Sequence, residues 1–182
     1  MLFRCILVCA LLAPLACDNK DSTPAPAPAS SASAADDLGA MTEYMRKSKS
    51  AEAKVNLGAI ARGIASASQQ ESVGPDGTLG RFVLAAAPLT PPAGVCCKQP
   101  KGRCAADSGD WKHPAWRAIF FELGDPHYYS YEVVVDATGF IARAVGDLDC
   151  DGSLATFELR GTLTAGGAYE IAAEPTSTAP LE

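Results

Sequence analysis

Apolar residues recur every three or four positions along the proline-free stretch from Met41 to Ser68. Most residues in this stretch are helix formers, so the spacing predicts one long helix over residues 41–70. One stripe of this helix is suited to cover a sheet, and it consists of Ala53, Leu57, Ile60, Ile64 and Ala67. At about 100° per residue, a second stripe lies on roughly the opposite side. It consists of Met41, Tyr44, Met45, Ala51 and Val55.

The pattern changes after the run Gly74-Pro75-Asp76-Gly77, which cannot continue a helix. A short strand is expected over residues 79–84, and residues 88–111 read as a loop stiffened by prolines and cysteines. Alternating apolar and β-branched residues then predict four strands, over residues 115–123, 128–135, 140–145 and 154–163. Short turns separate them, and short connections join antiparallel neighbours. The predicted fold is α+β: one long N-terminal helix packed on an antiparallel sheet of four or slightly more strands, within residues 115–172.

The N-terminal segment has the features of an export signal. Arg4 precedes an apolar run that is too short to span a bilayer, so residues 1–16 are predicted to be a signal peptide. The run ends at Ala16 and Cys17 and resembles the lipobox of bacterial lipoproteins, although Pro14 stands where a leucine-like residue is usual. That resemblance implies cleavage before Cys17 and lipidation of its side chain. The alternative is an ordinary secretory signal that is cleaved nearby.

Composition divides the rest of the chain. Residues 17–37 are rich in Pro, Ala and Ser and are expected to form a disordered tether behind the lipidated cysteine. Residues 38–174 are enough for one compact domain, and residues 175–182 are expected to be a disordered tail. The chain carries a formal charge of −6, and removing Arg4 with the signal leaves −7. This acidic balance excludes nucleic acid as a natural partner.

Four cysteines remain in the predicted domain: Cys96, Cys97, Cys104 and Cys150. An even number in an exported chain predicts disulfides. A bond between the adjacent Cys96 and Cys97 would strain the backbone, so we expect one of them to pair with Cys104 and the other with Cys150. The alternative is a metal site made by these thiols with His113, but their spacing matches no familiar zinc pattern.

An acidic run before the last predicted strand matches a calcium-loop spacing. Its candidate oxygen ligands are the side chains of Asp147, Asp149, Asp151 and Glu158 and the carbonyl of Ser153. Strands rather than helices flank the run, so the competing interpretation is a polar hairpin loop in which the aspartates make local turns. A bound calcium would be structural. Neither histidine of the chain accompanies a nucleophile or phosphate-binding motif, and we expect no catalytic activity.

Two segments resemble type IV pilins and pseudopilins. The sequence YMRKSKSAEAKVNLGAIARGI is similar to the second half of the long N-terminal pilin helix, and YEVVVDATGFIARAVGDLDCDGSLATFELRG is similar to the closing strands of pilin-like domains. The apolar front end with which pilins anchor and polymerise is missing, so ordinary polymerisation into a pilus is not expected. The resemblance suggests that the second helix stripe contacts another subunit or a partner. The alternative is that the helix frays before Ser48 or that these side chains are singly exposed.

These patterns together predict a lipid-anchored, pilin-like protein of the cell envelope with a structural or interaction role. Its partners would be the membrane, through the lipid, and proteins of a type IV pilus or type II secretion apparatus. The anchor would lie in the inner or outer membrane, with the domain in the periplasm or at the cell surface. The alternative function is an exported binding module, calcium-dependent or not, for a periplasmic or extracellular ligand.

Overall fold

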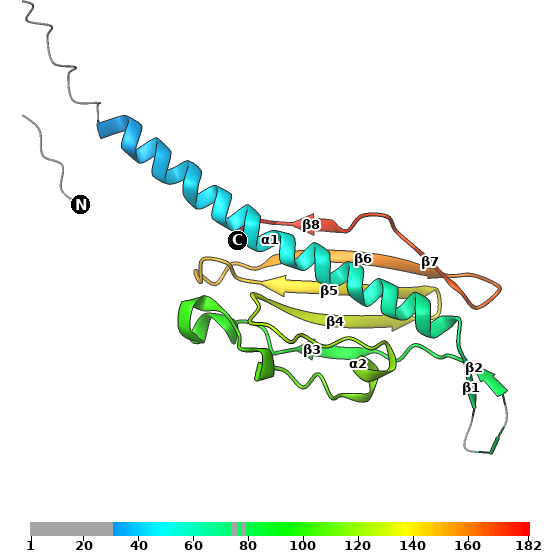
Figure 1. The fold of residues 1–182 in the computed structure, drawn as a ribbon. Coiled ribbons are helices and arrows are strands. Elements are labelled where there is room, and N and C mark those ends of the chain that lie inside the picture. Colours follow the sequence, from blue (N-terminus) through cyan, green and yellow to red (C-terminus); the bar gives the residue numbers. More distant parts are fainter. Residues whose placement is uncertain (1–30, 74–75, 78) are drawn as a thin grey trace, which may run out of the picture.

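A long helix crosses one face of an antiparallel sheet in the computed structural model of the chain (Figure 1). The structure describes residues 31–73, 76–77 and 79–182, so the predicted signal peptide, Cys17 and most of the predicted tether lie outside the described residues. The helix and the sheet form two layers with the core between them. The predicted α+β class, with one long helix on an antiparallel sheet, is confirmed.

Helix α1 spans Ser31–Ser68 and is longer at its front than the sequence predicts. It takes in residues 31–37, which were expected to belong to the disordered tether. Those residues are mainly alanine, serine and aspartate without proline, and a packed helix extends readily into such a segment because propagation costs little after nucleation. The helix is also continuous through Ser48, so the alternative in which it frays before that residue is not observed.

The sheet-facing stripe of α1 is buried as predicted. Leu57, Ile60 and Ile64 have no exposed surface, and they belong to one core cluster with residues of β4, β5 and β6. The helix lies against β5, β6 and β7. The opposite stripe remains in solvent, which explains why Val55 is 66% exposed within the packed half of the helix.

Replacing either of two glycines of α1 with alanine should change the free energy of unfolding, and the two changes should have opposite signs. A Cβ at Gly63 would lie 2.1 Å from the carbonyl oxygen of Ile119, which is backbone and has little freedom to move. We expect Gly63→Ala to lower the free energy of unfolding by about 1–3 kcal/mol through overpacking. At Gly58 the nearest atom is the tip of the Arg62 side chain, at 3.3 Å.

Gly58→Ala is the matched control. It should raise the free energy of unfolding by about 0.5–1 kcal/mol, because alanine loses less backbone entropy in a helix. Urea denaturation of the two variants measures both values. Equal effects of the two substitutions would contradict the close approach of α1 to the segment at Ile119.

The main sheet has six strands, all paired antiparallel. Five follow the order β3-β4-β5-β6-β7, and the sixth, β8, pairs with β6 on the side where β7 also lies. Their bounds are Ala87–Thr90 for β3, Tyr129–Asp136 for β4, Gly139–Gly146 for β5, Ala155–Leu163 for β6, Tyr169–Ile171 for β7 and Thr176–Thr178 for β8. The predicted strands over residues 128–135, 140–145 and 154–163 therefore correspond to β4, β5 and β6.

The predicted strand over residues 115–123 is wrong. Helix α2 occupies Pro114–Ala118, and the chain then turns through Phe120, which has a positive φ of 54°. His113 caps this helix by accepting from the N–H of Ala115 through Nδ1, at 3.3 Å, and Pro114 is suited to the first helical turn. Alternation of apolar residues in so short a run does not distinguish a strand from a helical turn.

Five further short strands were not predicted in full: β1, β2, β3, β7 and β8. Strand β3 falls in the expected loop, and it accommodates Pro88 because it lies at the edge of the sheet, where a missing N–H removes no ladder bond. Strand β8 lies in the expected tail and is held by its pairing with β6. Strands β1, Glu71–Val73, and β2, Leu79–Arg81, form a separate hairpin, so only the first part of the strand predicted over residues 79–84 exists.

Candidate functional site

Two disulfides fasten the long loop between β3 and β4, one within the loop and one to the turn between β5 and β6. Cys96 is bonded to Cys104, and Cys97 is bonded to Cys150. The loop contains three 3-10 turns, η1 at Cys96–Lys98, η2 at Pro100–Gly102 and η3 at Ala106–Ser108. Two disulfides were predicted, and the structure decides which of the adjacent cysteines has which partner.

The β5–β6 turn is organised by its own aspartates. Asp147 accepts from the backbone N–H of Cys150 at 2.6 Å through one carboxylate oxygen and from that of Gly152 at 3.0 Å through the other. Asp151 accepts from the N–H of Ser153 at 2.7 Å, which lowers the pKa of its carboxyl. These are the local turn bonds that the hairpin interpretation predicts.

The same turn is fastened to the helix. Arg46 of α1 forms an ion pair with Asp149 at 2.7 Å, and Lys49 donates to the carbonyl oxygen of Leu148 at 2.9 Å. Together with the Cys97–Cys150 bond, these contacts join α1, the disulfide loop and the β5–β6 turn. A cavity of about 360 Å³ lies at this junction and is lined by residues of all three, including Thr42 and Met45.

The predicted calcium ligands are only partly brought together. Carboxylate oxygens of Asp147, Asp149 and Asp151 lie within 4.8 Å of one another. Glu158 lies instead on β6, where its oxygens accept from Arg143 at 3.0 Å and from Arg160 at 2.7 Å. Arg143 on β5 is also paired with Glu132 on β4, so Glu158 belongs to a charge network across three strands. Calcium binding with Ser153 as a further ligand stays a prediction of the sequence.

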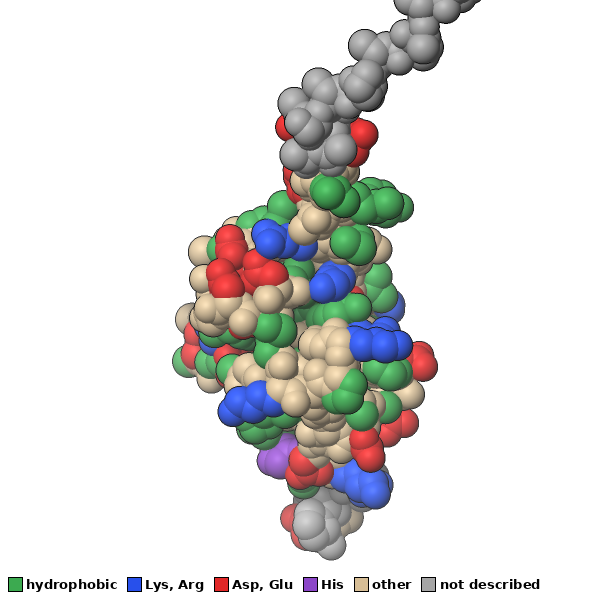
Figure 2. Space-filling model, turned by 90° about the vertical axis from the view of Figure 1, so that its left-hand side faces the viewer, with side chains coloured by type: hydrophobic (Ala, Val, Ile, Leu, Met, Phe, Trp, Pro, Cys, Tyr) green, Lys and Arg blue, Asp and Glu red, His purple; other side chains and the backbone are tan. Residues whose placement is uncertain are grey.

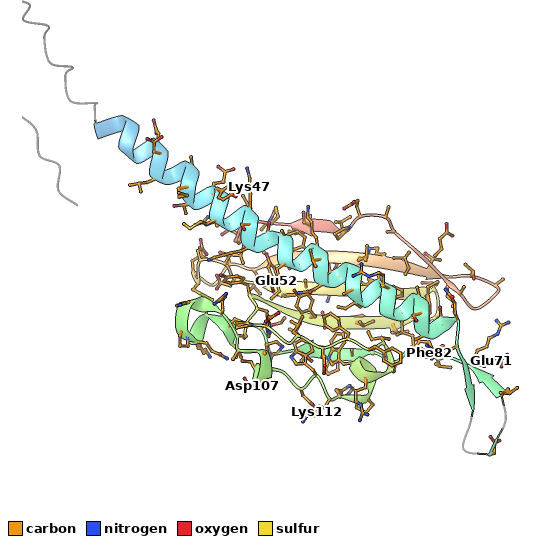
Figure 3. The ribbon with its side chains drawn as sticks, viewed as in Figure 1. Lys47, Glu52, Glu71, Phe82, Asp107 and Lys112 are labelled. Carbon is orange, nitrogen blue, oxygen red and sulfur yellow. A yellow bond between two sulfur atoms is a disulfide. The ribbon has the colours of Figure 1, made fainter. Side chains whose placement is uncertain are left out.

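Glu52 is a half-buried anchor that the sequence pattern did not single out. It projects from the side of α1 that faces β4, opposite to Lys47 (Figure 3). Its carboxylate accepts from the N–H of Tyr128 at 3.0 Å, from the N–H of Tyr129 at 3.3 Å and from the hydroxyl of Tyr131 at 3.2 Å. Asn56 also donates to that hydroxyl, at 2.8 Å. Glu52 therefore fixes α1 to the start of β4.

The charge of Glu52 should make stability depend on pH. Burial raises the pKa of Glu52 above its ordinary value of 4.5, although the backbone bonds at Tyr128 and Tyr129, the Tyr131 hydroxyl and the charge of Arg103 oppose this shift. The folded state therefore binds the proton more tightly than the unfolded state. The contribution of Glu52 to the free energy of unfolding should fall as the pH rises from 4.5 through the raised pKa.

The variant Glu52→Gln, which does not titrate, measures this effect. As the pH falls, the free energy of unfolding of the wild type should increase relative to that of the variant. Urea denaturation of both proteins between about pH 7 and about pH 4 gives this difference. If the difference in the free energy of unfolding stays constant over this range, the raised pKa of the Glu52 carboxyl is contradicted.

His127 is a buried polar residue that the sequence did not indicate. Only 2% of its surface is exposed, and its ring lies edge-on to that of Trp111 with 5.8 Å between the ring centroids. Burial lowers the pKa of His127. His113, which was considered with the cysteines as a metal ligand, caps α2 instead.

The front of α1 carries an uncovered apolar surface, which we call the front face. It consists of Leu38, Met41, Tyr44 and Met45, with exposed fractions from 50% to 71%. In Figure 1 this part of the helix extends beyond the edge of the sheet, and Figure 2 shows hydrophobic side chains gathered at this end of the molecule. Among the described residues, no helix is both long enough and apolar enough to cross a membrane.

The chain matches no model of a protein family, no curated protein and no solved structure. Its class therefore rests on architecture: an α+β domain in which a long helix covers an antiparallel sheet and two disulfides fasten the β3–β4 loop. The features suited to function are the front face, the junction of α1 with the β5–β6 turn, the half-buried Glu52 and the buried His127.

Proposed function

We propose that this chain is a lipid-anchored, pilin-like protein of the cell envelope that acts through protein contacts and not through catalysis. The observation that carries the proposal is the front face of α1. The rear half of the helix completes a core, while the front half presents large apolar side chains to solvent on a segment that extends past the sheet. Large exposed apolar side chains that gather in one place are typical of interaction sites.

The position of the front face in the chain supports an anchor. The helix begins at Ser31, and the predicted lipidation site, Cys17, lies a short tether earlier in the sequence. A lipid at Cys17 would keep the front face near the membrane surface, where components of a pilus or secretion apparatus are embedded. In this proposal the lipid supplies the membrane contact, because an acidic domain is a poor partner for a surface of anionic lipid.

Site-specific photocrosslinking in intact Gram-negative cells tests the proposal. A benzophenone amino acid is placed at position 44 in the front face, in place of Tyr44, which is 71% exposed. The matched control places it at position 164, in place of the exposed Thr164, in the turn between β6 and β7. Position 44 should capture a protein of a pilus or secretion system, identified by mass spectrometry, and position 164 should not.

A different capture pattern would count against the proposal. If both positions yield the same products, the front face has no specific partner. If position 44 captures only soluble periplasmic or extracellular proteins, the alternative function of an exported binding module is favoured. A third variant, Met41→Lys, should reduce the specific product, because a charge in an apolar contact must be desolvated.

A further inference from the structure

The ring of His127 lies beside the Cys96–Cys104 disulfide. A ring nitrogen of His127 and the two sulfur atoms lie within 4.8 Å of one another. Nδ1 of His127 is 3.1 Å from the carbonyl oxygen of Asp125, and Nε2 is buried without a hydrogen-bond partner in the described part of the chain. An unpaired buried polar atom costs about 1–3 kcal/mol, so such atoms frequently mark a function.

The backbone holds these three residues in fixed positions. Cys104 and His127 face each other in an antiparallel bridge, with N–H to carbonyl distances of 2.8 Å and 3.0 Å. Cys96 starts the turn η1, and its side chain is held near Cys104 by the disulfide. All three residues are buried. The two sulfurs and the imidazole are thus a preorganised set of donors.

We propose that Cys96, Cys104 and His127 form a zinc site when the disulfide between the two cysteines is reduced. A dithiol supplies the two electrons and two protons: its sulfurs form a disulfide, the Cys96–Cys104 bond breaks, and both cysteines become thiols. Zn²⁺ then displaces the two thiol protons to solvent and binds two thiolates and one imidazole. The disulfide and the zinc complex are alternative states of the same three residues.

The donor set and its geometry favour zinc over calcium or magnesium. Thiolate and imidazole are ligands of zinc, whereas calcium and magnesium take oxygen. With Zn–S and Zn–N bonds of roughly 2.3 Å and 2.0 Å, tetrahedral donors lie roughly 3.5–3.8 Å apart. The sulfurs therefore separate by a small movement when the disulfide opens. The Asp125 carbonyl accepts from Nδ1–H and leaves the lone pair of Nε2 for the metal, which is the usual outer-shell arrangement of zinc ligands.

A cavity of about 350 Å³ borders His127. The acidic residues Glu52, Glu122 and Asp125 line it together with the histidine. Negative groups around a concave site raise the local concentration of cations. A water molecule would be the fourth zinc ligand, since a site with three protein ligands keeps one open position.

Residue-resolved alkylation of the full chain tests the zinc site. The protein is reduced with a phosphine, supplied with Zn²⁺ or with a chelator, treated with iodoacetamide, and digested for mass spectrometry. With zinc, alkylation of Cys96 and Cys104 should slow at least about tenfold, because the bound thiolate is not available as a nucleophile. Cys97 and Cys150 are internal controls and should react equally fast in both conditions.

Variants and a spectroscopic signal complete the test. His127→Gln should abolish the protection, and His113→Gln should leave it unchanged. Co²⁺ in place of zinc should give thiolate charge-transfer bands in the reduced wild type and lose at least about tenfold in affinity in His127→Gln. Protection of all four cysteines, retained protection in His127→Gln, or loss of the folded circular-dichroism signal in the reduced protein with zinc would each overturn the proposal.

Discussion

Replacing Ile60 with alanine is expected to lower the free energy of unfolding by about 2–5 kcal/mol. Ile60 has no exposed surface and belongs to the cluster of buried residues between α1 and the sheet. Removing three carbons there loses the transfer free energy of the methyl and methylene groups and leaves a cavity in a cluster that also contains Tyr131 of β4 and Phe157 of β6. Side chains held on a sheet collapse only partly into such a space.

Val55→Ala is the matched control on the same helix. Val55 lies on the opposite stripe and is 66% exposed, so its truncation should change the free energy of unfolding by no more than about 0.5 kcal/mol. Urea denaturation followed by circular dichroism gives both values, with equal slopes if the transition remains two-state. If the two variants lose a similar free energy of unfolding, α1 does not pack against the sheet through the face that contains Ile60.

Removing the Cys97–Cys150 bond should cost more stability than removing the Cys96–Cys104 bond. The first closes 53 residues of chain and the second closes 8. The chain-entropy relation then gives about 4 kcal/mol for the long loop and about 2.5 kcal/mol for the short one. The long-range bond also holds the β5–β6 turn in place for its ion pair with Arg46.

The paired variants Cys97→Ser with Cys150→Ser and Cys96→Ser with Cys104→Ser measure this difference. Both are compared with the oxidised wild type by urea denaturation without reductant, so that the remaining disulfide stays intact. Equal losses, or a larger loss for the short loop, would contradict the entropic explanation. A larger loss than predicted for the long loop is consistent with the additional contacts of Arg46 and Lys49.

The sequence predicted the parts of the fold that local pattern determines. The buried stripe of α1 follows from helical spacing, and β4, β5 and β6 follow from alternation between short turns. The turn after β4 shows why such turns can be predicted: Asp136 accepts from the N–H groups of Thr138 and Gly139, which needs only residues adjacent in sequence. These predictions required no information about distant parts of the chain.

The elements that the sequence missed depend on distant partners. The segment after His113 forms α2 because Trp116 is drawn into the core, where its indole N–H donates to Thr90 at 2.9 Å. Strand β8 exists because β6 offers it a free edge. Neither the position of Thr90 nor the exposed length of β6 can be deduced from the short runs themselves.

The same limit applies to the candidate site. The number of disulfides could be predicted from the count of cysteines. Which of Cys96 and Cys97 pairs with Cys104 depends on the folded structure. The sequence pattern singled out neither Glu52 nor His127 as a structural residue. Glu52 is half-buried and His127 is buried, and each contacts a residue far away in sequence, Tyr128 in the first case and Cys104 in the second.

In the proposed function, a lipid at Cys17 keeps the front face of α1 close to a membrane. Intact mass spectrometry of the protein from the membrane fraction of a Gram-negative host tests this directly, with Cys17→Ala as the control. We predict a mature chain that begins at Cys17 and carries acyl groups, and a Cys17→Ala variant that retains residues 1–16 and carries no acyl group. A wild-type chain that keeps its leader, or that is cleaved but not acylated, would contradict the account.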